Sequence, residues 1–183
     1  MKDKIFSAAK KLFAEKGFIK TTIRDIAEEA KVSRGLIHWY YKSKDELIKE
    51  VALTSFPHQR IKEVLGRSYS NVKSFFEDLC KEYIDFYSDV LNRKIFLHVL
   101  SLKERFPEIE KVYKILAETL MEEGAKKLAS LGCDISYRKA EIVFRTLYSS
   151  LFFYIQTEKY VKINITEFFE SLVDILLKGI SCE

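Results

Sequence analysis

Apolar residues recur along this chain of 183 residues at spacings of three and four, which is the period of an amphipathic helix. No segment alternates apolar and polar residues in the manner of a strand. The first helix is predicted near the N-terminus and ends at Gly17, a residue that a left-handed helix cap prefers. Its apolar stripe consists of Ile5, Ala9, Leu12 and Phe13.

Three shorter helices are predicted next, and each follows a residue that can cap it. Thr22 and Asp25 have the spacing of a capping box, with Asp in place of the usual Glu. Ser33 can cap the third helix. Ser43 and Glu46 have the capping-box spacing at the start of the fourth.

Only Lys31 and Val32 separate the second predicted helix from the third. Two short helices joined by so tight a turn, behind a longer first helix, match the helix-turn-helix plan. The turn has no glycine, which many such motifs carry, but Ala27 is small enough to let the two helices pack closely.

Five further helices are predicted, at about residues 71–91, 92–106, 107–131, 137–160 and 166–181. Pro107, Gly132 and the polar segment 162–164 serve as the breaks between them. The fourth helix runs from about residue 44 into the sixties and kinks or stops near Phe56, because Pro57 follows. The predicted fold class is therefore all-α, with about nine helices.

The composition is that of a compact, helix-rich globule, with 48% hydrophobic residues, 32% charged residues and only 6 Gly and 2 Pro. No stretch approaches 18 uncharged apolar residues, and lysines interrupt the apolar residues at the N-terminus. We therefore expect no membrane span and no signal peptide. Cys80, Cys133 and Cys182 are widely spaced and form no CxxC pair, so reduced thiols in a cytoplasmic protein are expected.

The positive charge is concentrated at one end of the chain. Residues 1–50 hold 12 Lys and Arg against 8 Asp and Glu, a net charge of +4. Residues 51–183 hold 19 of each and are neutral. A basic module attached to a neutral body indicates a polyanionic partner.

Four consecutive rings lie among cations in the segment SRGLIHWYYKSKDEL, residues 33–47. On a helix with 100° per residue, one arc faces the first two helices and the other faces outward. The inward arc contains Leu36, Ile37, Tyr40 and Tyr41. The outward arc contains Arg34, Gly35, His38 and Trp39. A recognition helix in the major groove of DNA needs both faces, since one locks it to its scaffold and the other contacts the duplex.

The outward residues have the chemistry that DNA recognition requires. Arg34 can bind guanine in a bidentate manner, and Gly35 lets the backbone approach a phosphate closely. The polar ends of the rings can donate to phosphate or base edges, while their faces can touch a thymine methyl group. Lys44 adds charge in the first turn of the fourth helix. Alternatively, exposed rings could form a protein interface or a solvated patch.

The segment LFAEKGFIKTTIRDIAEEAKVSRGLIHWYYKSKDEL resembles the N-terminal domain of the tetracycline-repressor (TetR) family of transcriptional regulators, over roughly residues 3–50. The resemblance implies a homodimeric, all-helical DNA-binding protein, usually a repressor that a small molecule releases from its operator. It divides the chain into a helix-turn-helix DNA-binding domain, residues 1–48, and an effector-binding and dimerisation domain, residues 49–183.

The resemblance also implies individual DNA contacts. Thr22 would contact a phosphate from the start of the second helix, and Lys44 would clamp another. The remaining implied contacts are Ser33, Arg34, Gly35, His38, Trp39 and Tyr40. His38 departs from the family, which usually has Tyr there, and its ring is shorter and titratable. Tyr41 stands where Phe is common, which can place a hydroxyl at the edge of the core.

The last two predicted helices, 137–160 and 166–181, are heavily apolar. The resemblance implies that they pair with a second copy to form a homodimer; alternatively they are simply core of one copy. Two-fold symmetry would place two recognition helices about one turn of DNA apart, on a double-stranded, pseudo-palindromic operator.

The resemblance further implies a cavity for an effector in residues 49–183. Aromatic residues are frequent there and few periodic charges point inward, so the expected effector is an apolar small molecule. The residues predicted to line the cavity are Phe86, Tyr87, His98, Tyr113, Phe144, Tyr148 and Phe152. His98 alternatively packs as a satisfied core histidine. Ligand binding would reposition the fourth helix and thereby change the fit of the two recognition helices to DNA.

Three other classes of function compete with this interpretation. No nucleophile–base pair, phosphate loop or metal cluster is visible, so neither an enzyme nor a cofactor or metal site is expected. A DNA-binding protein without sequence preference and a helical protein-interaction module without an effector remain as alternatives. The sequence leaves open the operator, the regulated genes, the effector, the number of dimers on an operator, and whether the protein represses or activates.

Overall fold

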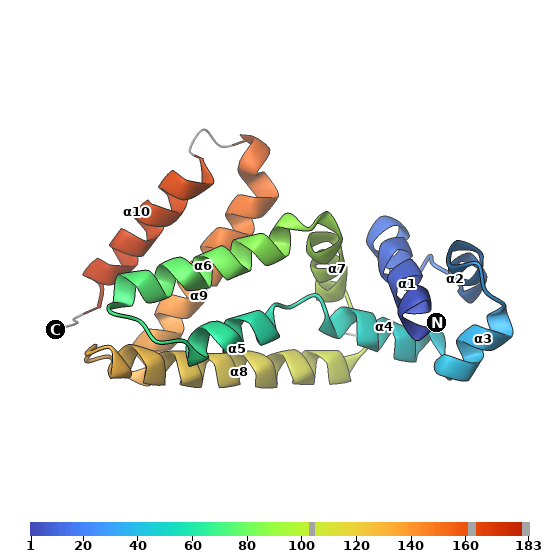
Figure 1. Cartoon of the computed structure of the whole chain (residues 1–183), viewed down its shortest axis with the longest axis horizontal. Coiled ribbons are helices and arrows are strands. Elements are labelled where there is room, and N and C mark those ends of the chain that lie inside the picture. The colour runs from blue at the N-terminus through green and yellow to red at the C-terminus, as the bar shows by residue number, and fades with distance from the viewer. Residues whose placement is uncertain (103–104, 161–163, 181–183) are drawn as a thin grey trace. The chain divides into compact units, whose positions relative to one another are not determined.

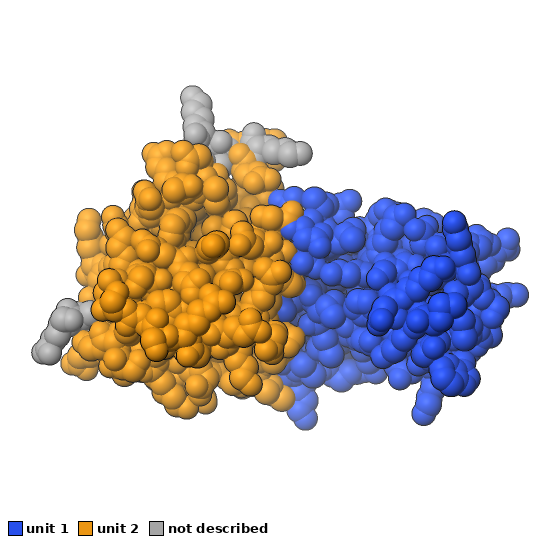
Figure 2. Space-filling view, in the orientation of Figure 1, with its two compact units in different colours: residues 1–56, 89–113 blue, residues 57–88, 114–183 orange. Residues whose placement is uncertain are grey.

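The structure, a computed structural model, describes residues 1–102, 105–160 and 164–180 (Figure 1). These residues form ten α-helices, one 3-10 helix and no strand, so the predicted all-α fold class is confirmed. The chain divides into two compact units: unit 1 comprises residues 1–56 and 89–113, and unit 2 comprises residues 57–88 and 114–183 (Figure 2). The two units are defined by packing within each of them. Neither unit begins or ends at residue 48, the predicted boundary between the two functional domains.

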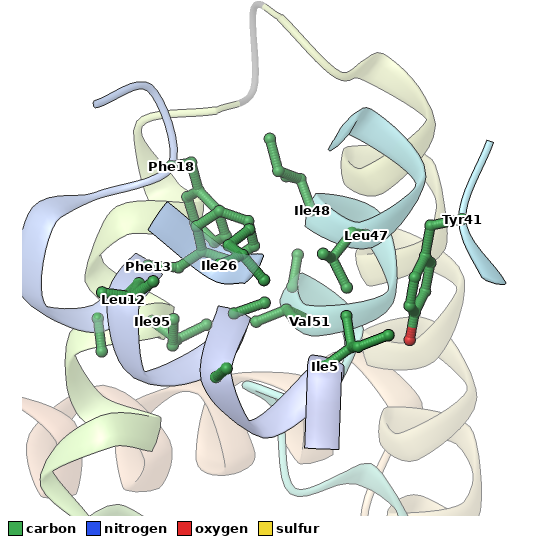
Figure 3. Close-up of a cluster of buried hydrophobic side chains, with 14 of the residues drawn as sticks. Ile5, Leu12, Phe13, Phe18, Ile26, Tyr41, Leu47, Ile48, Val51 and Ile95 are labelled. Atoms are coloured by element: carbon green, nitrogen blue, oxygen red, sulfur yellow. The ribbon is translucent and has the colours of Figure 1, made fainter. Parts of the chain in front are cut away.

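Unit 1 is built around α1 (Lys2–Lys16), which packs against α2 (Ile23–Ala30), α4 (Lys44–Leu53) and α7 (Val90–Leu100). The unit also contains α3 (Arg34–Tyr40), which packs against α2, and the first residues of α8 (Pro107–Ser130). The predicted stripe of α1 lies in one buried cluster, in which Ile5 and Phe13 of α1 lie with Val51 of α4 and Ile95 of α7 (Figure 3). Burying that stripe fixes α1, and α1 in turn supports the elements that carry the basic surface.

Unit 2 contains the remaining helices, and its core includes a cluster of aromatic side chains. Its elements are α5 (His58–Gly66), α6 (Val72–Ser88), the rest of α8, α9 (Tyr137–Thr157), a 3-10 turn (Glu158–Tyr160) and α10 (Ile165–Lys178). Phe75 and Phe76 of α6 and Phe144 of α9 are fully buried, with ring centroids 5.4–6.3 Å apart. At these separations the rings interlock and contribute beyond simple area burial.

Of the two alternatives predicted at Pro57, a kink or a stop, the structure shows the stop. The fourth helix ends at Leu53 and a separate helix, α5, begins at His58, so the described residues form ten α-helices where about nine were predicted. The ring of Pro57 disfavours the helical conformation of the residue before it. The helix predicted at 92–106 begins at Val90, because the Asp89 side chain accepts a hydrogen bond from the Leu91 amide and so caps α7. Residue 181, the predicted end of the last helix, lies outside the described residues.

The capping predictions are confirmed at α2 and only half confirmed at α4. Thr22 and Asp25 form a complete capping box. The Ser43 hydroxyl accepts from the Glu46 amide at 3.2 Å, as predicted. The Glu46 carboxylate, however, accepts from the amide of Lys42 at 2.8 Å and not from that of Ser43.

The expectation of reduced thiols is wrong for one cysteine. Cys80 of α6 is free and buried, but Cys133, in the turn after α8, is disulfide-bonded. Cys182 lies outside the described residues. A disulfide depends on how close two side chains lie in space, which spacing along the sequence does not reveal.

Gly124 is the close-packing point of unit 2. A Cβ at this position of α8 would lie 2.5 Å from Cε2 of Phe144, whose ring is held by Phe75 and Phe76. We expect Gly124→Ala to destabilise the protein by about 1–3 kcal/mol, because a well-packed core cannot absorb an extra methyl group. Urea or thermal denaturation at fixed protein concentration measures the change.

Gly66 is the matched control, because no atom lies within 4 Å of the Cβ that it would gain. We expect Gly66→Ala at the end of α5 to be neutral or to stabilise by up to about 1 kcal/mol, since alanine restricts the unfolded chain. Equal stability of the two alanine variants would contradict the packing role of Gly124.

Candidate nucleic-acid interface

The turn between α2 and α3 is a hydrogen-bonded helix end. The amide of Lys31 donates to the carbonyl of Glu28 at 3.2 Å, and the amide of Val32 donates to that of Ala27 at 3.0 Å. Lys31 has φ 53° and ψ 48°, the left-handed conformation that usually favours glycine. The Ser33 side chain then accepts from the Leu36 amide and starts α3. These bonds fix the angle at which α3 leaves α2.

The two faces of α3 agree with the prediction from helical spacing. Ile37 and Tyr41 are buried with 0% and 1% exposure, and Leu36 and Tyr40 pack against the same cluster. All four outward residues, Arg34, Gly35, His38 and Trp39, are exposed. The seven-residue helix is thus held by its apolar side and presents its polar side to solvent.

Trp39 is the largest exposed feature of this surface, with 75% of its area accessible. Its ring lies edge-on to that of Tyr40, with centroids 4.6 Å apart. An aromatic side chain this exposed gains little from folding and is typical of a contact surface. The edge-on contact with the half-buried Tyr40 restricts the position of Trp39 on the helix.

The two threonines before α2, Thr21 and Thr22, have different structural roles. Thr21 is fully buried, and its hydroxyl donates to the carbonyl of Gly17 at 2.9 Å, which closes the loop after α1. Thr22 is exposed, and its hydroxyl donates to Asp25 at 2.8 Å while its oxygen accepts from the Asp25 amide. Hydrogen bonds from Thr22 lower the pKa of the Asp25 carboxyl group, which keeps the cap ionised. Thr22 therefore lies at the surface with its hydroxyl already engaged in the cap.

Lys44 is more constrained than the sequence indicates. Its ammonium donates to the carbonyl of Ile19 at 3.2 Å, which ties the start of α4 to the loop after α1. Burial, followed by repulsion from Arg105, lowers the pKa of Lys44. Its predicted contact with a phosphate stays a prediction, and the structure adds a stabilising role within unit 1.

Two further cations belong to this surface and were not predicted as site residues. Arg24 and Lys31 line an open depression of about 620 Å³ together with Ser33 and Arg34. Arg24 bonds to Glu28 at 2.8 Å, one helical turn further along α2. The sequence shows that Arg24 lies on the polar side of the second helix and Lys31 in the two-residue turn. It does not show that both lie close to Arg34, because that depends on the angle between α2 and α3.

The residues predicted to line an effector cavity fall into two groups. Five of them lie in unit 2 and form ring contacts with centroids 4.8–6.4 Å apart, through Tyr83 as well. These five are Phe86, Tyr87, Phe144, Tyr148 and Phe152. Burial raises the pKa of the Tyr83 and Tyr148 hydroxyl groups, so this cluster carries no charge near neutral pH.

The other two, His98 and Tyr113, lie in unit 1 and are not part of that cluster. The imidazole of His98 lies beside Gly17 and edge-on to Phe18, with centroids 6.2 Å apart, which agrees with a packed core histidine. The hydroxyl of Tyr113 donates to the carbonyl of Ala52 and lies 2.6 Å from the hydroxyl oxygen of Ser55. These contacts join α8 to the end of α4.

Two other findings concern the described residues as a whole. Across residues 1–102, 105–160 and 164–180, no three His, Cys, Asp or Glu side chains come together as a metal site. Within the same ranges, no helix is long and apolar enough to cross a membrane.

Comparison with known proteins places this surface in a wider group. Residues 5–51 match the family described as bacterial regulatory proteins, tetR family. The HTH-type transcriptional regulator HbdR of Aromatoleum sp. is 57% identical to this chain over 44 residues, which cover 24% of this chain and 19% of HbdR. YerO of Bacillus subtilis, described as an uncharacterized HTH-type transcriptional regulator, is 28% identical over 131 residues.

The YerO match covers 64% of this chain and 42% of YerO, so less than two thirds of either relative is spanned. Among solved structures, NalD of Pseudomonas aeruginosa, the secondary repressor of the MexAB-OprM multidrug efflux pump, is similar with a TM-score of 0.73. That similarity covers 97% of this chain and 94% of NalD at 19% identity, and it extends the shared fold to both units.

Proposed function

We propose that this chain, which belongs to the tetR family of bacterial regulatory proteins, is a DNA-binding transcriptional repressor. In this proposal it binds a pseudo-palindromic operator, and an apolar small molecule releases it. The observation that carries the proposal is the two-faced helix α3, whose buried Ile37 and Tyr41 hold Arg34, His38 and Trp39 toward solvent. The matched proteins are transcriptional regulators, which agrees with the prediction that the chain is not an enzyme.

The outward side of α3 would lie in the major groove of double-stranded DNA. Arg34 would contact guanine, for which a bidentate guanidinium is the best-matched side chain. His38, Trp39 and Tyr40 would contact phosphates, base edges or thymine methyl groups. The residues that would position the protein on the backbone are Thr22, Ser33, Gly35 and Lys44. The net charge of +4 in residues 1–50 supports this orientation, because counterion release from the phosphates favours a basic face.

A homodimer through α9 and α10 is part of the proposal. Both helices expose large apolar side chains in this single chain: Ile142 and Phe153 on α9 are 58% and 69% exposed, and Ile175 on α10 is 65% exposed. Exposed apolar side chains of this size on adjacent helices are typical of protein interfaces. A two-fold axis through them would give two copies of α3 for two half-sites, about 34 Å apart.

An apolar effector in unit 2 is the third part. Phe86, Tyr148 and Phe152 are half-buried, whereas their neighbours Tyr87 and Phe144 are fully buried. Half-buried rings on an uncharged ring cluster offer a surface that an apolar molecule can cover without stranding a polar group. The physical character of the cluster supports an apolar ligand and leaves its identity open.

A route from effector to DNA follows from the course of α8. This helix continues from residues of unit 1 into residues of unit 2. In unit 1, the hydroxyl group of Tyr113 on α8 is hydrogen-bonded to the carbonyl of Ala52 and to the hydroxyl group of Ser55, at the end of α4. A ligand that displaced α8 would therefore move the end of α4, and with it the fit of α3 to DNA. The ligand must prefer one arrangement for this to shift the equilibrium.

The rival functions make different demands. A DNA-binding protein without sequence preference needs only the basic charge, and a protein-interaction module needs only the exposed Trp39. A protein that reads a sequence needs a residue such as Arg34 in addition, because its contacts with base edges distinguish one DNA sequence from another. We propose the sequence reader, acting in the cytoplasm.

The DNA contact is tested with Arg34→Ala. We expect the wild-type protein to prefer a fragment upstream of its own gene over random DNA, and to keep that preference as salt is raised. The variant should lose about 1–3 kcal/mol of that preference, because a bidentate contact with one base pair is lost. Competition binding measured by fluorescence anisotropy gives the preference of the wild-type protein and that of the variant.

Lys94→Gln on α7 is the matched control, because it removes one exposed positive charge of unit 1 from outside the helix-turn-helix. It should leave the preference unchanged. If wild-type protein bound both DNAs equally at every salt concentration, the reader would be ruled out in favour of a general phosphate binder.

The dimer is tested with Phe153→Arg on α9. We expect this variant to sediment as a monomer at concentrations where the wild type is a dimer, since a charge buried in an apolar interface is left unpaired. Ile115→Arg on α8, which alters an equally apolar and 52% exposed site, should remain dimeric. A dimeric Phe153→Arg protein would show that the interface lies elsewhere.

The effector is tested by thermal shift with long-chain acyl compounds and hydrophobic aromatic acids, against sugars as polar controls. A ligand present at 100 times its Kd stabilises the native state by about 2.7 kcal/mol. For a chain of this size that raises the Tm by roughly 5–10 °C. Shifts produced by the sugars and not by the apolar compounds would contradict the proposed class of ligand.

A further inference from the structure

Lys31 occupies a backbone conformation that costs stability. Among the described residues it is the only residue other than glycine with a positive φ, 53°. The hydrogen bonds from Lys31 and Val32 back to Glu28 and Ala27 require this left-handed conformation at the end of α2. Glycine adopts it freely, whereas a side chain with a Cβ is strained there. The turn is thus built for glycine and contains lysine instead.

The side chain of Lys31 is exposed. Among the residues that the structure describes, it forms no hydrogen bond or ion pair that would offset the strain. Glu29, whose carboxylate interacts electrostatically with Lys31, is already bound by Lys11 at 2.7 Å. Local stability therefore does not explain a lysine at this position.

The surroundings of Lys31 are basic. It lines the open depression between α2 and α3 with Arg24 and Arg34. Glu28 is the one acidic residue that lines the depression, and Arg24 bonds to it at 2.8 Å. The ammonium of Lys31 and the guanidinium of Arg34 therefore lie at the same surface without a carboxylate bound to either of them in the described structure. That arrangement favours an anion from outside the chain.

We propose that Lys31 is a phosphate-binding residue of the DNA interface, contacting the backbone beside the groove that α3 enters. This inference rests on the proposed function. Lys31 stands in the turn and not on α3, so its flexible side chain extends toward the strand that borders the groove. An ammonium is a point charge without the planar geometry that distinguishes bases, which suits it to phosphate. The strained lysine would be retained for binding, at the expense of local stability.

Lys31→Gly separates the two effects, because binding and stability should change in opposite directions. The variant relieves the backbone strain, so its melting temperature should rise. It also removes one phosphate contact, so the slope of log K against log salt should become shallower by about 0.9. If the affinities converge at 1 M salt, that slope corresponds to about eightfold weaker binding at 0.1 M. Random DNA and the upstream fragment should lose affinity by the same factor.

Two further variants serve as controls for this test. Lys31→Asn removes the charge but tolerates the left-handed conformation, so it should reproduce the binding defect of the glycine variant. Lys31→Arg keeps the charge and should retain the wild-type salt slope. Fluorescence anisotropy of labelled duplexes between 50 and 200 mM salt, with the two DNAs in parallel, measures all four proteins.

Several outcomes would overturn the inference. A more stable Lys31→Gly protein with an unchanged salt slope would make Lys31 a tolerated turn residue. Unequal losses on the two DNAs would mean that Lys31 contacts bases. A lower melting temperature of the glycine variant would refute the strain. Wild-type protein without salt-dependent DNA binding would refute the proposed function itself, which is a distinct result because it needs no variant.

Discussion

The burial of one side of α3 is the constraint on which the rest of the account depends. A helix of seven residues has no stability of its own in water, because nucleation costs more than a few hydrogen bonds return. Ile37 and Tyr41 are removed almost entirely from solvent and belong to the cluster that contains Ile5 of α1 and Leu47 of α4. Figure 3 shows Tyr41 together with Ile5 and Leu47. Burying such side chains contributes about 1.5–3 kcal/mol each. That burial fixes both the existence of α3 and the direction of its other side.

Some side chains of the candidate DNA interface are bonded within unit 1, and others are not. Thr22 and Lys44 are both engaged within unit 1, the former in the cap of α2 and the latter on the carbonyl of Ile19. The side chains of Arg34 and Lys31, in contrast, form no hydrogen bond or ion pair in the described part of the chain. Thr22 and Lys44 therefore stabilise unit 1, whereas the side chains of Arg34 and Lys31 are available to bind an anionic partner. The distinction separates residues that position the surface from residues that bind.

Local signals in the sequence predicted the local structure well. The cap at Thr22 and Asp25 and the inward direction of Ile37 follow from spacing along one helix, where only a few neighbouring residues matter. Contacts between distant segments could not be predicted in this way. The bond from Lys44 to Ile19 spans 25 residues, and the disulfide of Cys133 depends on proximity in space. The strain at Lys31 follows from the hydrogen bonds that end α2, and the sequence alone does not show which backbone conformation those bonds impose.

The aromatic residues of unit 2 illustrate a second limit. Apolar burial is non-directional, so the same sequence pattern is compatible with a core, a ligand site or a subunit interface. Phe144 proves to be core, fitted against Gly124, whereas Phe153, nine residues later on α9, is exposed. His98 and Tyr113 match the pattern of a cavity but belong to unit 1, where they contact Gly17 and Ala52. Only the three-dimensional arrangement separates these roles.

Trp39 offers the most direct measurement of the central claim, because it is the only tryptophan of the chain and lies on the outward face of α3. Its fluorescence can be quenched with acrylamide, a neutral molecule that the charge of DNA does not repel. If α3 lies in the groove, adding the upstream DNA fragment to the unmodified protein should shield Trp39 and lower the quenching constant several-fold. If the protein bound this DNA while Trp39 stayed as accessible as in the free protein, α3 would not be the helix that contacts the duplex.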